Sequence, residues 1–513
     1  MSSIIKVDTI QDQAGNNIIN ESGNTITIGA SGDTITIPSG ATFTNSGTTS
    51  AITISGALSV DGGTIKLDGN YPTGTDNVAL GNEALDSGSL SGGNNTAIGD
   101  NALSANTSGA NNTAIGQAAL CTNLTGGSNV AVGRCTLKLN TASNNVAVGY
   151  HSMCTTSSGT ENTAIGMSSL KSNTTADFNT ALGNQTLCKN TTGTNNTAVG
   201  ACALEANTTG GNNVAVGKSA LITNTTGICN TALGRTSMEL NTTGSCNVAV
   251  GKDALSNNTT AVYNTAVGFQ TLKVGTTATQ NTGIGALSLD AATTGSYNTG
   301  SGYASLSALT TGTCNVSAGY IAGSGITTGS CNVAIGAHTL SATSTGDRNT
   351  AVGLCALKVN TASANTAIGS AALLSNTSGS SNVALGNSME QNTTGSDNTA
   401  AGNGALQANT TGADNTAVGR LSLKANTTGD SHTAVGLKTL CANTTGLCNT
   451  AIGAYSLDAN TTGCCNTAVG LGTLGTNTTA INNTAIGSCS LFANTTGDSN
   501  TAVGTDALKA NTT

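Results

Sequence analysis

Charged and aromatic residues are scarce in this chain. Of its 513 residues, 8% are charged and 2% are aromatic, and there are no tryptophans and only 2 prolines. The net charge of −8 is spread thinly and no basic run occurs, so we expect no nucleic-acid partner, which would need a Lys/Arg footprint. No run of about 18 apolar residues is present, and we therefore expect no membrane insertion.

What the chain does have argues against disorder. Disordered segments combine high charge with few apolar residues, whereas this chain has little charge and 37% apolar residues. Its 68 glycines, together with many Asn and Thr residues, suit tight turns. The N-terminus, MSSIIKVDTIQDQ, lacks the pattern of a secretory signal, so we expect synthesis in a cytoplasm without general export.

One motif recurs 26 times from Asn77 to the last residue, close to N-[T/V]-A-[V/I/L]-G-x-x-[A/S/T]-L-x-x-N-T-T-G-x-x. We number its residues as repeat positions 1 to 17. Of the 25 steps between copies, 21 are 17 residues, one is 18 and three are 16. So short and strict a period predicts a solenoid in which each coil stacks on its neighbours. The expected fold is an all-β parallel β-roll or β-solenoid of about 26 coils, roughly 125 Å long at the usual strand spacing.

Each coil carries two apolar columns. Position 4 is Val, Ile or Leu in 23 of 26 coils, and position 9 is Leu or Met in nearly all. We expect both columns to form the structural core. The representative core residues are Val132, Leu137, Val199, Leu204, Val216, Leu221, Val250 and Leu255.

Glycine occupies position 5 in every coil, which indicates a turn with positive φ or a close backbone contact. The representative turn residues are Gly133, Gly200, Gly217 and Gly251. We expect a strand at positions 2–4, the glycine corner, a second strand at positions 7–10, and then an Asn-Thr-Thr-Gly turn. The Asn column at position 12 predicts a hydrogen-bonded ladder along the stack, in preference to glycosylation of N-T-T.

Two apolar columns are few for a free-standing coil, because the stretch at positions 12–17 is polar. We therefore expect association with other copies of the chain, and we favour a homotrimer.

Residues 1–76 differ from the repeats. Segments such as 25–38 and 51–60 alternate β-branched or apolar residues with polar ones, which is typical of strands. The sequence thus predicts two parts: an N-terminal β-rich module at 1–76 and the solenoid at 77–513.

No catalytic, cofactor-binding or metal-binding residues are predicted. The 15 cysteines occupy a few repeat positions, and three pairs lie one period apart, which makes an inter-coil disulfide conceivable; small apolar substitution is the favoured reading. The three histidines are scattered, so no zinc site is expected. Between Gly275 and Thr343 the position-12 Asn column is lost and three tyrosines appear. We interpret this as repeat drift, in preference to a kink or a ligand patch.

The pentapeptides N-V-A-V-G (Asn129–Gly133, Asn145–Gly149) and N-T-A-I-G (Asn95–Gly99) resemble the S-V-A-I-G head repeat of trimeric autotransporter adhesins of the YadA-like type. The resemblance implies three chains in a left-handed parallel β-roll that binds host surfaces. It departs in period, since that family's coil is nearer fourteen residues. No signal peptide, coiled-coil stalk or membrane anchor of that family is seen.

The N-terminal segment, MSSIIKVDTIQDQAGNN…TITIGASGDTITIPSG, resembles the start of tail-fibre and other virion fibre proteins of marine bacteriophages. This implies attachment to phage tail or baseplate proteins through the N-terminus, contact with a host cell-surface glycan or protein, and a virion location. Many such proteins end in a self-cleaving chaperone domain. This chain ends in mid-repeat at 510–513, and we expect a truncated sequence.

The function expected is therefore that of a structural, adhesive fibre without enzymatic activity. A bacterial cell-surface adhesin is the alternative. An ice-binding solenoid is the third possibility, suggested by the adjacent Thr columns at positions 13 and 14, but ice-binding faces need flat rows, and adjacent residues point to opposite sides.

Overall fold

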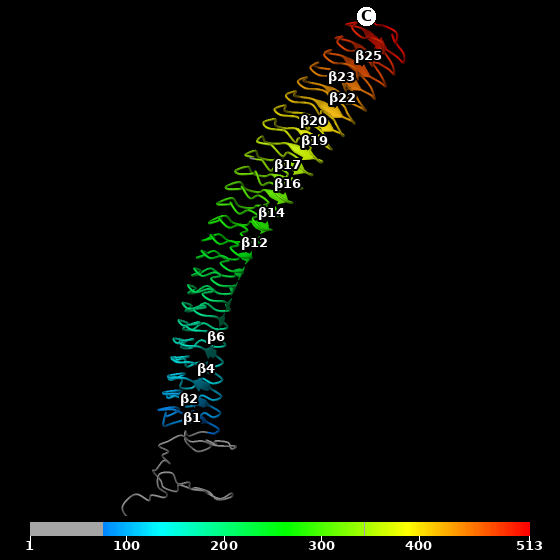
Figure 1. Cartoon of the computed structure of the whole chain (residues 1–513). Coiled ribbons are helices and arrows are strands. Elements are labelled where there is room, and N and C mark those ends of the chain that lie inside the picture. The colour runs from blue at the N-terminus through cyan, green and yellow to red at the C-terminus, as the bar shows by residue number, and fades with distance from the viewer. Residues whose placement is uncertain (1–74, 343, 513) are drawn as a thin grey trace, which may run out of the picture. The chain divides into compact units, whose positions relative to one another are not determined.

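The computed structural model describes residues 75–342 and 344–512. The prediction of a β-rich module falls on residues 1–74, outside the described part. The described residues contain 26 short β-strands and no helix, with successive coils stacked in chain order (Figure 1).

The strands are β1 (Val78–Leu80), β2 (Thr96–Ile98), β3 (Thr113–Ile115), β4 (Val130–Val132), β5 (Val146–Val148), β6 (Thr163–Ile165), β7 (Thr180–Leu182), β8 (Thr197–Val199), β9 (Val214–Val216), β10 (Thr231–Leu233), β11 (Val248–Val250), β12 (Thr265–Val267), β13 (Thr282–Ile284), β14 (Thr299–Ser301), β15 (Val316–Ala318), β16 (Val333–Ile335), β17 (Thr350–Val352), β18 (Thr366–Ile368), β19 (Val383–Leu385), β20 (Thr399–Ala401), β21 (Thr416–Val418), β22 (Thr433–Val435), β23 (Thr450–Ile452), β24 (Thr467–Val469), β25 (Thr484–Ile486) and β26 (Thr501–Val503).

Each strand pairs in parallel with the strand of the next coil, so the 26 strands form one continuous parallel sheet. The register repeats without slip: Ala215 of β9 lies opposite Ala232 of β10, which lies opposite Ala249 of β11. The described repeats are thus an all-β parallel β-solenoid with one three-residue strand per coil, and the 17-residue period is the length of one coil.

The strands point their small residue inward and their large residue outward. Ala215 is completely buried, whereas Val216 beside it is 38% exposed. Leucine at position 9 fills the interior, as Leu204 and Leu221 show at 0% exposure. The expectation that position 4 faces the core is therefore wrong. Of the representative residues, the structure buries Leu137, Leu204, Leu221 and Leu255, exposes Val216 and leaves Val132, Val199 and Val250 half-buried on the outer face.

The asparagine at position 1 explains this reversal. Side chains alternate across a strand, so positions 1 and 3 share one face and positions 2 and 4 share the other. Asn213 is buried, and its Nδ2 donates to Gly227 O (2.9 Å) and to Oδ1 of Asn196 one coil earlier (3.2 Å). These bonds satisfy an interior carbonyl, and they hold position 1 inside. The alanine at position 3 therefore points inward, and the valine at position 4 points outward.

The glycine at position 5 forms a tightly packed corner. Gly200 has φ of +125°, and a Cβ atom there would lie 2.7 Å from the carbonyl carbon of Gly217 in the next coil. Both the φ value and the contact exclude a side chain. The predicted turn residues Gly133, Gly200, Gly217 and Gly251 all have φ between 125° and 135°.

Positions 7–10 do not form the second strand that we expected. Cys202 at position 7 and Leu204 at position 9 have positive φ values of 58° and 52°. The N–H groups of these two residues point to the coils on opposite sides. Cys202 donates backward to Asn184 O (3.0 Å), and Leu204 donates forward to Ala220 O (3.0 Å). The segment is therefore bonded between coils without β geometry. Because these residues are not glycines, the sequence gives no sign of their left-handed conformation.

The asparagine ladder predicted at position 12 is confirmed. Asn224 donates from Nδ2 to Oδ1 of Asn207 (2.8 Å), and Asn241 donates likewise to Asn224 (2.8 Å). Each also donates within its own coil to the position-15 carbonyl, as Asn224 does to Gly227 O (3.1 Å). The second ladder, at position 1, was not predicted. Two buried amide columns thus run beside the leucine column.

Candidate binding groove

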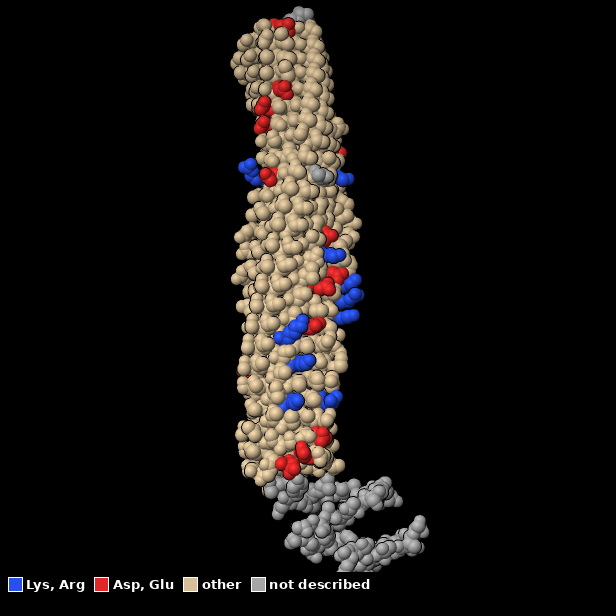
Figure 2. All heavy atoms as spheres, turned by 90° about the vertical axis from the view of Figure 1, so that its left-hand side faces the viewer, with Lys and Arg blue, Asp and Glu red and all other residues tan. Residues whose placement is uncertain are grey.

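Charged side chains are confined to two bands of the solenoid. Between residues 77 and 512, every Lys, Arg, Asp and Glu lies at positions 6–11 or at positions 16–17. Thirteen of the fourteen Lys and Arg residues in this part occupy positions 6, 7, 10 or 11, and Arg348 at position 17 is the exception. Figure 2 shows these side chains scattered over a surface that is otherwise uncharged. The band at positions 6–11 therefore holds nearly all the cations of an acidic chain.

The acids at position 16 are structural. Asp177 accepts from the backbone N–H of Thr160 through Oδ1 (2.7 Å), and Asp430 accepts from Ala413 N in the same way (2.7 Å). Each carboxylate thus satisfies a backbone donor of the preceding coil. This role needs no ligand.

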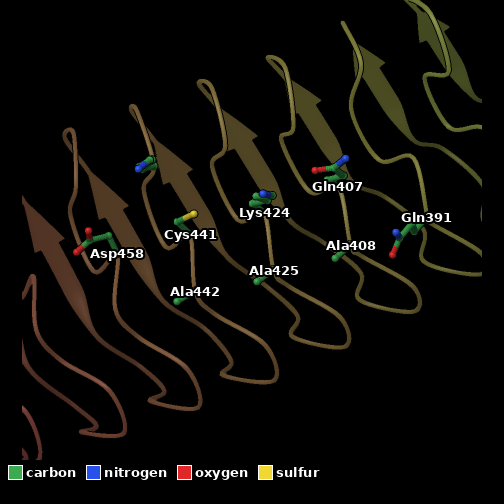
Figure 3. Close-up of a pocket in the computed structure, with 9 residues that line it drawn as sticks. Gln391, Gln407, Ala408, Lys424, Ala425, Cys441, Ala442 and Asp458 are labelled. Carbon is green, nitrogen blue, oxygen red and sulfur yellow. The ribbon is translucent and has the colours of Figure 1, made fainter.

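A groove of about 630 Å³ runs along this band across five consecutive coils (Figure 3). Its lining residues come from positions 7, 10 and 11, which the stacking brings side by side. They are Gln391, Gln407, Ala408, Lys424, Ala425, Lys438, Cys441, Ala442 and Asp458.

The floor of the groove is a row of alanines with no free backbone donor. Ala408 N donates to Lys424 O (3.0 Å), Ala425 N to Cys441 O (3.1 Å), and Ala442 N to Asp458 O (3.0 Å). The small methyl groups at position 11 leave the hollow between longer side chains at position 10. Recognition in this groove must therefore come from side chains.

The rim carries amides, ammonium groups and a carboxyl. Gln407 Nε2 donates to the carboxylate of Glu390 (3.2 Å), and the Lys438 ammonium lies 5.9 Å from the centre of the Tyr455 ring. Lys424 and Lys438 are exposed and form no ion pair with any described residue. Two cations beside the hollow are thus available to a ligand.

Burial raises the pKa of two groups in the groove. Desolvation raises the pKa of the Cys441 thiol, with Lys424 and Lys438 opposing the shift. Desolvation also raises the pKa of the Asp458 carboxyl, opposed by backbone hydrogen bonds and Lys438. A thiol with a raised pKa is a poor nucleophile, so the geometry suits binding better than bond-breaking chemistry.

None of the residues predicted from the sequence as core or turn lies in the groove. They belong to positions 4, 5 and 9, whereas the groove belongs to positions 7, 10 and 11. Its residues are 16 or 17 apart in the chain, so no local motif marks them. A signal does appear when equivalent positions of successive coils are compared. Position 10 holds Gln, Lys, Cys and Asp in turn, and position 11 beside it holds Ala repeatedly.

The drifting stretch has a filled interior. Ala292, Leu309 and Ile326 replace the position-12 asparagines and are completely buried. Tyr303 and Tyr320 are exposed and stack on each other, with ring centres 5.6 Å apart. After Gly275, the position-12 column thus changes from polar to apolar side chains.

The cysteines and histidines do not gather into a site. All 15 cysteines lie in the described part and are free thiols. His432 takes the place of asparagine at position 1 and is buried. Within residues 75–342 and 344–512, no group of three or more potential ligands is arranged to hold a metal ion.

No protein-family model matches this chain, and no curated protein matches it. In the part of the chain that the structure describes, no helix has the length and apolar character needed to cross a bilayer.

Proposed function

We propose that the chain is a structural fibre protein, the shaft and host-contact element of a bacteriophage tail fibre, and that it acts as a homotrimer without enzymatic activity. Residues 1–76 would join tail or baseplate proteins of the virion, and the solenoid would meet the host cell surface. The observation that carries the proposal is the outer face of the sheet, formed by positions 2 and 4.

This sheet face is uncharged along the described repeats, with a mostly aliphatic row at position 4 beside Thr or Val at position 2. Position 4 is Val, Ile or Leu in 23 coils, and 16 of these side chains are exposed while the other seven are half-buried. No charged residue occurs at positions 1–5 of any coil. Single exposed aliphatic residues are ordinary, but a long contiguous row marks a surface that a partner covers. A regular repeat is best matched by the same repeat in sister chains.

Charges on the two borders of this face favour parallel association. Five cations and one acid, Asp100, follow the strand at position 6, whereas seven acids and one cation occupy positions 16–17. In a cyclic assembly of parallel chains, the position-6 border of one copy meets the position-16–17 border of the next. Opposite charges then approach each other, which favours this arrangement over antiparallel packing. The position-6 cations are Arg134, Lys218, Arg235, Lys252 and Arg420.

Sedimentation equilibrium tests the proposal. The wild-type chain is expected at the mass of three copies, and Leu182→Asp with Val216→Asp should yield monomers, because buried unpaired charges at the interface are costly. Ile222→Asp, at position 10 away from the sheet face, is the matched control and should remain trimeric. A monomeric wild type, or a trimer unaffected by the double change, contradicts the proposal.

A second candidate function, ice binding, is favoured by the same face. Thr or Val at position 2 and an aliphatic residue at position 4 form two straight outward rows, unlike the adjacent threonines at positions 13 and 14. Thermal hysteresis by a monomeric chain would support this candidate against the fibre. A cell-surface adhesin would share the trimer and differ in where the protein is located.

A further inference from the structure

We propose that the groove from Gln391 to Asp458 binds a linear acidic polysaccharide, laid along the direction in which the coils stack. This deepens the proposed function, on which it rests for the place where such a polymer would be met: the host surface.

The shape favours an extended polymer. The lining residues come from five consecutive coils, and at the usual strand spacing four intervals cover roughly 19 Å. The same repeat positions line the groove at every coil: alanine recurs at position 11, and Gln407, Lys424, Cys441 and Asp458 follow one another at position 10 (Figure 3). A ligand with its own short repeat can satisfy such a row, whereas a compact ligand would use only part of it.

The floor favours a sugar over a peptide. An extended peptide gains affinity by pairing with free backbone groups at a sheet edge. Here the N–H groups of Ala408, Ala425 and Ala442 are already bonded to the next coil. The aliphatic residues that line the hollow are all alanines. What remains on the rim are amide, ammonium and carboxyl groups, which pair well with hydroxyls.

The rim favours an acidic sugar. Lys424 and Lys438 stand over the hollow without an ion pair among the described residues, and Arg420 lies at position 6 of the same coil as Lys424. Of the two nearby acids, Glu390 is held by Gln407. The other, Asp458, lies in the coil after Lys438 and contributes a single carboxyl against the two lysines. Charge-assisted bonds from the two lysines to carboxylates are the strongest contacts available here.

Sister chains do not account for these cations. In the trimer proposed above, the neighbour's acids would approach at position 6, beside the sheet face. Lys424 at position 10 and Lys438 at position 7 follow that border and line the hollow instead. Their partner is therefore expected to be a separate molecule.

The test uses the full chain and three probes by titration calorimetry: alginate as a linear polyuronate, dextran as a neutral polysaccharide, and polyglutamate as an anion without sugar rings. We expect alginate to bind best, and more weakly as salt is raised. Lys424→Gln with Lys438→Gln should weaken alginate binding at least tenfold. Ala425→Trp, which fills the floor, should weaken it similarly. The matched controls, Lys358→Gln at position 10 and Ala206→Trp at position 11, lie outside the groove and should bind like the wild type.

Several results would overturn the assignment. They are a failure of the wild-type chain to bind alginate, groove variants that bind alginate as well as the wild type does, and binding of dextran as tight as that of alginate. Polyglutamate bound equally well through the same lysines would assign the groove to an acidic polypeptide instead. Sedimentation of the same samples separates the two proposals, since a monomer that still binds alginate through the groove contradicts the trimer and leaves the groove intact.

Discussion

Asn224 donates a hydrogen bond from Nδ2 to Oδ1 of Asn207, 2.8 Å away in the preceding coil. Both side chains are completely buried. Each rung of this ladder therefore joins two coils through the interior, where an unpaired amide is expensive. The ladder stabilises the stack only while it is continuous. We therefore expect the local stability of the coils to be lower where the ladder is interrupted.

Replacing Asn224 by alanine should destabilise the repeats around it. The change leaves Oδ1 of Asn207 without its donor and removes one of the two acceptors of Asn241 Nδ2, which still donates to Gly244 O (3.0 Å). Each unsatisfied buried group costs about 1–3 kcal/mol. We expect a lower melting temperature and faster amide exchange in the adjacent coils than in distant ones. Uniform exchange along the chain, with unchanged melting, would contradict the role of the ladder.

Extending the ladder at its break should stabilise the chain. Oδ1 of Asn258 is buried without a partner, because the next coil has Gly275 at position 12. A Cβ atom at Gly275 would lie 3.1 Å from its nearest neighbour, the carbonyl oxygen of Ala292, so a small adjustment admits a side chain. Gly275→Asn is expected to gain about 1 kcal/mol from one new hydrogen bond. Gly275→Ala is the control that separates this bond from the loss of glycine flexibility; equal stability of the two variants would refute the new bond.

His432 should make stability depend on pH. Its Nδ1 accepts from Asn449 N (3.1 Å) and its Nε2 faces Gly446 O (2.6 Å), which fits a neutral ring. Burial lowers the pKa of His432 in the folded chain below its usual value near 6.5. The unfolded chain therefore takes up the proton first. The stabilisation is complete above the unfolded pKa, and it is lost as the pH falls below it towards the folded pKa.

The measurement is the melting temperature between pH 8 and pH 5, compared in the wild type and in His432→Asn. The asparagine restores the residue found at position 1 elsewhere and has no titrating group. We expect the variant to lose less stability on acidification than the wild type. Parallel curves for the two proteins would show that His432 is not responsible.

The sequence by itself determined the coil. A strict period of 17 with glycine at position 5 and leucine at position 9 admits little besides a stacked β-solenoid, and the leucines at Leu204 and Leu221 are buried as the pattern indicates. The position-12 ladder also followed from the sequence, because identical residues one period apart must lie side by side in a stack.

Only the tertiary structure decided which way each residue points. Val216 points outward because Asn213 is held inside by its bonds within its own coil and to the preceding coil, and hydropathy alone cannot weigh those bonds against an aliphatic side chain. The non-glycine residues with positive φ at positions 7 and 9 were hidden for a similar reason, since bonds between coils impose that conformation. The groove likewise exists only once Lys424 and Cys441, one period apart in the chain, become neighbours through stacking.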